Sequence, residues 1–100
     1  MIIYVDIDGT ICDTPNIDGK WDYRKSNPTQ SHIDKINKLY DEGHEIIYWT
    51  ARGGITKKDW SELTGEQLKS WGCKYNELKM NNKPHYDLLI CDKTKRIEEI

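Results

Sequence analysis

Three short apolar runs constrain the fold of this chain more than any other feature of its sequence. They occupy residues 2–7 (IIYVDI), 45–50 (EIIYWT) and 86–91 (YDLLIC). A strand with one face in water alternates apolar and polar residues, but these runs stay apolar over most of their length. They are therefore typical of strands buried on both faces of a parallel sheet.

Two segments with helical periodicity separate the runs. The first begins near residues 29–31 and ends at Gly43, and its apolar residues recur at helical spacing: Ile33, Ile36, Leu39 and Tyr40. The second covers residues 58–71 and is stopped by Gly72. Its apolar residues follow the same spacing: Trp60, Leu63, Leu68 and Trp71.

The remaining segments complete the predicted architecture. Residues 75–80 are expected to add a short strand, and residues 13–28, with two prolines and a glycine, to form a long loop. Strands that alternate with helices predict an α/β sandwich with a mostly parallel sheet of about four strands.

Length and composition limit the classes of protein that this chain can belong to. One hundred residues are enough for a single domain, expected over residues 1–100. No stretch approaches the roughly 20 apolar residues of a membrane helix, and the N-terminus lacks the basic region of a signal peptide. Three cysteines without a CxxC spacing favour the reducing cytoplasm.

Polar residues stand where the predicted strands end, and ligands bind at the carboxyl ends of strands in open parallel sheets. Acids, a hydroxyl and cations meet there: Asp6, Asp8, Thr50, Arg52, Lys83 and Asp92. Three carboxylates suit Mg²⁺, which prefers oxygen ligands. A hydroxyl, a guanidinium and an ammonium complement the oxygens of a phosphate.

The spacing of the first two acids assigns them different roles. Side chains alternate along a strand, so Asp6 and Asp8 start on one face, and Gly9 then permits a sharp turn. A carboxylate in the site can attack phosphorus and form an aspartyl-phosphate. A second carboxylate can protonate the leaving oxygen and later take a proton from water.

These residues resemble the motifs of the haloacid dehalogenase (HAD) phosphatase superfamily over nearly the whole chain. The DIDGT sequence that begins at Asp6 looks like its first motif. Thr50 in YWTAR, Lys83 in NKP and Asp92 in LLICDK look like the second, third and fourth. The chain is most similar to small members without a cap domain that are associated with capsule-polysaccharide biosynthesis, and it also resembles polynucleotide 3′-phosphatases.

The resemblance implies a fold and a role for each residue. The fold would be a Rossmann-like three-layer sandwich without a cap. Asp6 would be the nucleophile and Asp8 the general acid and base, with Lys83 as a further catalytic residue. The phosphoryl group would be held by Thr50, Ala51, Arg52 and Lys83. The Mg²⁺ ligands would be Asp6, the main-chain carbonyl of Asp8, and Asp92.

One position departs from the family pattern. Those relatives usually have two acids where this chain has Cys91 and Asp92. A thiol does not replace a carboxylate as a ligand of Mg²⁺. Either Asp92 alone completes the metal site, or the affinity for the metal is weakened.

The motifs themselves specify neither the substrate nor the acceptor of the phosphoryl group. Basic residues and aromatics gather in the loops expected around the site: Lys20, Trp21, Tyr23, Arg24, Lys25, Arg52, Lys57, Lys58, Trp60, Lys93, Lys95 and Arg96. This rim would suit a nucleotide or a nucleic-acid end. Acids share the same segments and the net charge is −2, which favours a small phosphorylated metabolite. Phosphotransfer to another acceptor, or a binding module that has lost turnover, are the alternatives.

The choice of Asp92 as the third metal ligand is testable. Asp87 stands at the other end of the same predicted strand, about 15 Å away. We therefore expect Asp92→Ala, but not Asp87→Ala, to raise steeply the Mg²⁺ concentration that gives half-maximal phosphatase activity. The opposite ranking of the two variants would assign the ligand to Asp87.

Overall fold

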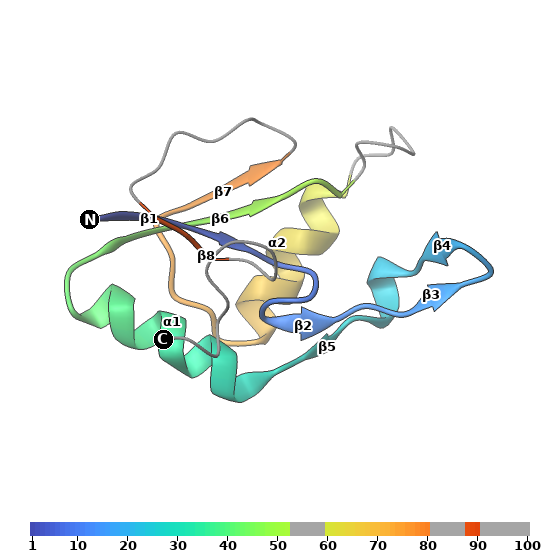
Figure 1. The fold of residues 1–100 in the computed structure, drawn as a ribbon, viewed down its shortest axis with the longest axis horizontal. Helices are drawn as coiled ribbons and strands as arrows, with labels where there is room; N and C mark the ends of the chain where they lie inside the picture. Colours follow the sequence, from blue (N-terminus) through green and yellow to red (C-terminus); the bar gives the residue numbers. More distant parts are fainter. Residues whose placement is uncertain (53–59, 81–87, 91–100) are drawn as a thin grey trace.

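The computed structural model describes residues 1–52, 60–80 and 88–90, and four strands of these residues form a central parallel sheet (Figure 1). Its strand order is β7-β6-β1-β8. The strands are β1 (Ile2–Asp6), β6 (Glu45–Thr50), β7 (Glu77–Met80) and β8 (Leu88–Ile90). Every pairing within this sheet is parallel. The predicted α/β class and parallel sheet are confirmed.

Two helices are present in the described part of the chain, α1 (Gln30–Asp41) and α2 (Ser61–Ser70). Each ends just before a glycine in the left-handed region, Gly43 with φ 99° and Gly72 with φ 73°. A glycine adopts this conformation without steric penalty, so both sequences stop a helix as predicted. Neither helix of these residues is long and apolar enough to cross a membrane.

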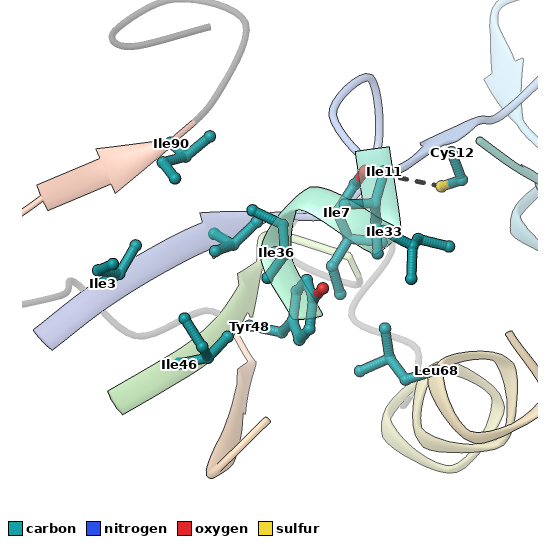
Figure 2. Packing of buried hydrophobic residues seen from close by; sticks show 11 residues of the cluster. Ile3, Ile7, Ile11, Cys12, Ile33, Ile36, Ile46, Tyr48, Leu68 and Ile90 are labelled. Carbon is teal, nitrogen blue, oxygen red and sulfur yellow. Dashed lines mark hydrogen bonds between the residues drawn. The ribbon is translucent and has the colours of Figure 1, made fainter. Parts of the chain in front are cut away.

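The core lies between one face of the sheet and both helices (Figure 2). Ile33 and Ile36 of α1 and Leu68 of α2 meet the sheet side chains, all fully buried. Those sheet side chains come from alternate positions of the two central strands: Ile3, Val5, Ile46 and Tyr48. On the opposite face of the sheet, Tyr4 and Ile47 are also buried. Both central strands are thus buried on both faces, as their continuous apolar sequences predict.

The segment predicted as a long loop is more ordered than expected. Cys12–Asp13 (β2) pairs with Asn27–Pro28 (β5), and Asn16–Ile17 (β3) pairs with Lys20–Trp21 (β4), both antiparallel. A short 3-10 helix, η1 (Tyr23–Lys25), follows. We call residues 12–28 the flap; its β3–β4 hairpin extends away from the sheet (Figure 1).

The turn residues explain why the flap forms a hairpin. Asp18 and Gly19 connect β3 to β4 and have φ of 52° and 80°. Two successive positive φ angles are what a tight two-residue hairpin turn requires, and Asp-Gly is a favoured pair there. The prediction of a loop without strands was wrong because the Asp18-Gly19 turn brings the residues on either side of it into antiparallel pairing.

Removing a side chain is expected to lower the free energy of unfolding more, the more deeply that side chain is buried. Ile36→Ala removes a fully buried side chain and should lower the free energy of unfolding by about 2–5 kcal/mol. Ile17→Ala, at a flap residue that is 47% exposed, is the matched control and should change it by about 0.5 kcal/mol or less. Urea unfolding of both variants measures the difference, and equal losses would contradict the assignment of the core.

Candidate active site

The parallel register of the two central strands creates the site. Asp6 is the last residue of β1 and pairs with Trp49, so Thr50 at the end of β6 follows at the same edge of the sheet. Asp6 is half-buried, and its Oδ1 accepts a hydrogen bond of 2.9 Å from the Ile7 backbone. The nucleophile and the hydroxyl expected from the sequence therefore lie at neighbouring strand ends.

A tight turn after β1 places the second acid. Gly9 has φ 82°, a backbone conformation that is strained for a residue with a side chain. Its N–H donates to the Cys12 carbonyl at 2.9 Å. The N–H groups of Thr10 and Ile11 both donate to the Ile7 carbonyl, at 3.1 and 3.0 Å. The chain folds back on itself, and Asp8 sits within this turn.

Asp8 forms a two-pronged ion pair with Arg52. The guanidinium Nε donates to Oδ2 at 2.9 Å, and Nη2 donates to Oδ1 at 2.7 Å. The Arg52 side chain is completely buried, whereas that of Asp8 is 25% exposed. A parallel pair of charge-assisted hydrogen bonds of this kind fixes the orientation of a carboxylate as well as stabilising it.

The other donors of Arg52 are also engaged by the protein. Nη1 donates to Thr64 Oγ1 at 3.2 Å and to Gln67 Oε1 at 2.5 Å, both on α2. Nη2 donates to Ser26 Oγ of the flap at 3.2 Å. The guanidinium also lies 4.8 Å from the centre of the Tyr23 ring. Arg52 thus joins the strand ends, α2 and the flap around Asp8.

The flap contacts Asp8 directly as well. Thr14 Oγ1 donates its proton to Asp8 Oδ1 at 2.5 Å. Ser26 Oγ therefore donates in the hydrogen bond of 2.6 Å between the Ser26 and Thr14 hydroxyls. The Cys12 thiol lies 3.7 Å from the same Oδ1 and 3.6 Å from the Ile7 carbonyl, which share its one proton. A chain of hydroxyls therefore connects the flap to the carboxylate.

Five of the site residues predicted from the sequence lie in the described part of the chain. The structure brings Asp6, Asp8, Thr50, Ala51 and Arg52 to one edge of the sheet, with Ala51 exposed and Thr50 buried. Thr50 Oγ1 accepts from the Arg52 backbone N–H at 3.2 Å. The Arg52 side chain, expected to hold phosphate, is directed instead at Asp8.

The other predicted residues lie outside the described part of the chain. They are Lys83, Asp87, Cys91 and Asp92 of the site and Lys57, Lys58, Lys93, Lys95 and Arg96 of the rim. Within residues 1–52, 60–80 and 88–90, no group of three or more His, Cys, Asp or Glu side chains is arranged to hold a metal ion.

The flap and helix partners of Arg52 were not predicted. Thr64 and Gln67 stand three positions apart on α2 and so share a face. Thr64 also lies one turn before Leu68 and is fully buried. A hydroxyl within the apolar stripe of a helix needs a buried polar partner, and this signal was available in the sequence.

The aromatic rim is only partly open to a ligand. Tyr23 and Trp60 pack edge to face with centroids 5.1 Å apart, and the Arg24 guanidinium lies 5.5 Å from the centre of the Trp60 ring. Trp21, on β4 of the flap, is 55% exposed. Of the three expected aromatics, Trp21 is thus the most accessible for stacking.

Comparison with known proteins supports the fold. No family model and no curated protein matches this sequence. The chain is similar to the crystal structure of a target protein from Vibrio cholerae, with a TM-score of 0.65 and 23% sequence identity. The match covers 83% of this chain and 71% of that one. At this identity the likeness concerns the fold alone, an α/β protein with a parallel sheet.

Cys12 and Cys73, the two cysteines of the described residues, are expected to be inert. Burial raises the pKa of Cys12 from 9.0 to about 12, and the neighbouring Asp8 charge adds to the effect. Burial also raises the pKa of Cys73, to about 11. Since the thiolate is the reactive form, both residues remain protonated and unreactive at pH 8.

A thiol reagent tests this directly. In a Cys91→Ser variant, Cys12 and Cys73 should react with DTNB at pH 8 at least about 100-fold more slowly in buffer than in 8 M urea, because unfolding restores an ordinary pKa. Rapid reaction of either thiol in the folded protein would contradict the burial described above.

Proposed function

We propose that this chain is a cytoplasmic phosphomonoester hydrolase of the HAD type, with a Rossmann-like three-layer fold and no cap domain. The observation that carries the proposal is the geometry at the sheet edge. Asp6 ends β1 beside Thr50 at the end of β6, and Asp8, two residues further on, is held by Arg52. Burial of both faces of the central strands supports the layered fold.

The residues allow a two-step hydrolysis. A carboxylate oxygen of Asp6 attacks phosphorus, and the bond between phosphorus and the leaving oxygen breaks. That oxygen keeps the electron pair and takes a proton from Asp8. Water then attacks the phosphorus of the aspartyl-phosphate and gives its proton to Asp8, while Asp6 leaves as a carboxylate. The products are an alcohol and inorganic phosphate.

Thr50 is suited to hold the phosphoryl group. Its oxygen accepts the Arg52 backbone N–H at 3.2 Å, which orients the hydroxyl so that its own proton is the donor. Lys83 is proposed to supply the positive charge that offsets the phosphate next to Asp6. Fixed donors placed where charge redistributes are the usual means of stabilising such a transition state.

The donor chemistry near Asp6 fits a magnesium ion. By the resemblance to HAD phosphatases, Asp8 would contribute its main-chain carbonyl to the metal, while its carboxylate is paired with Arg52. Asp6 would supply a carboxylate and Asp92 another, and such oxygen ligands are those that Mg²⁺ prefers. When bound, the ion would neutralise negative charge on the phosphate and on the carboxylates.

A small phosphorylated metabolite is the proposed substrate, in keeping with the net charge of −2. A nucleic-acid 3′ end is the second candidate, because Trp21 on the flap is 55% exposed and offers a face on which a base can stack. A non-catalytic binding module is the alternative of a different class.

Hydrolysis of p-nitrophenyl phosphate with and without Mg²⁺ tests the proposal. We expect metal-dependent turnover that EDTA removes, and a loss of several orders of magnitude in Asp6→Asn, because an amide of the same shape does not attack phosphorus. Asp34→Asn, at an exposed site on α1, is the matched control and should retain full activity.

Two results would contradict this function. Retention of more than about a tenth of the activity in Asp6→Asn would remove the nucleophile from the mechanism. Binding of phosphate compounds to the wild-type protein without any turnover would identify the chain as a binding module.

A further inference from the structure

We propose that Arg52 is a positioning residue for Asp8, that it does not bind the substrate phosphate, and that it directs proton transfer to Oδ2 of Asp8. This inference rests on the proposed function and goes beyond it by replacing the phosphate contact expected of Arg52. It also assigns a role to the contacts that α2 and the flap make with the guanidinium.

The donors of Arg52 show why a phosphate contact is not needed to explain this residue. An arginine has five N–H donors. Here Nε donates to Asp8, and Nη2 donates to Asp8 and to Ser26. Nη1 donates to Thr64 and to Gln67. Each donor therefore has a protein acceptor. An arginine that binds phosphate presents its fork to the ligand, whereas this fork is presented to Asp8.

The two oxygens of Asp8 are in different environments. Oδ1 accepts from Arg52 Nη2 at 2.7 Å and from Thr14 at 2.5 Å, and the Cys12 thiol lies 3.7 Å away. Among the described residues, Oδ2 accepts from Arg52 Nε alone, at 2.9 Å. Since a carboxylate oxygen has two lone pairs, Oδ2 keeps the acceptor capacity for a proton and Oδ1 does not.

Arg52 is in turn held from two sides. Gln67 accepts from Nη1 at 2.5 Å and donates through Nε2 to the Tyr23 carbonyl at 2.7 Å. The Tyr23 ring lies against the guanidinium, 4.8 Å from its carbon to the ring centre. Gln67 thus bridges α2 and the flap behind Arg52 without touching Asp8. We therefore expect a substitution of Gln67 to alter the rate of proton transfer only by displacing the Arg52 guanidinium.

The dependence of kcat/KM on the leaving group provides the test. An aryl phosphate such as p-nitrophenyl phosphate leaves without protonation, whereas an alkyl phosphate such as glycerol 1-phosphate requires it. The ammonium of Arg52→Lys lacks the planar fork. We expect this variant to lose about 100-fold in kcat/KM on the alkyl ester, no more than about 5-fold on the aryl ester, and less than about 2-fold in the Ki of inorganic phosphate.

A second variant keeps the test valid if Arg52→Lys does not fold. Gln67→Leu should show the same selective loss on the alkyl ester, reduced to about 10-fold, with an unchanged Ki for phosphate. Gln30→Leu, at an exposed position on α1, is the matched control and should leave all three values unchanged. Thermal unfolding establishes which variants are folded.

The possible failures are distinguishable. Equal losses on the two esters, or a tenfold rise in the Ki of phosphate in folded Arg52→Lys or Gln67→Leu, would overturn the positioning role while leaving the hydrolase proposal intact. A wild-type protein that hydrolyses neither ester would overturn both.

Discussion

The buried ion pair between Arg52 and Asp8 is the interaction on which the arrangement of the site depends. Removing a guanidinium from water is costly, and attraction to one carboxylate offsets that cost only when the remaining donors are also satisfied. Thr64, Gln67 and Ser26 provide those acceptors. The positions of α2 and the flap are therefore coupled to the turn after β1, because each contributes to the same guanidinium.

The parallel register of β1 and β6 makes this pair possible. Ile3 lies opposite Ile46 and Val5 opposite Tyr48, so one continuous face is buried under the helices. A slip by one residue would exchange the two faces of a strand and move these side chains out of the core. The apolar packing thus fixes the register, and the register fixes which polar residues meet at the carboxyl edge.

The sequence predicted those parts of the molecule that depend on local pattern. The buried strands, the two helices and the glycines that stop them follow from periodicity and backbone freedom, and Asp6 and Thr50 were located because strand ends coincide in a parallel sheet. The side-chain partners of Arg52 were not predictable in this way. Residue type specifies five donors but not their direction, which depends on where α2 and the flap pack. The Asp18-Gly19 pair and the position of Thr64 among apolar residues of α2 do indicate a hairpin turn and a buried polar contact. Both stand in segments whose composition is mostly polar.

The ion pair also determines which charges are left to act on a substrate. Arg52 compensates Asp8, so in the proposed reaction Asp6 and a phosphate dianion meet at the sheet edge without help from that guanidinium. Two like charges at contact distance repel strongly in a partly buried site, where the effective dielectric is lower than in water. The cations that offset this repulsion must therefore come from elsewhere, namely Lys83 and the proposed metal. Under the proposed mechanism, the pairing of Asp8 with Arg52 would therefore make catalysis depend on the proposed metal ion more strictly than the number of basic residues around the site suggests.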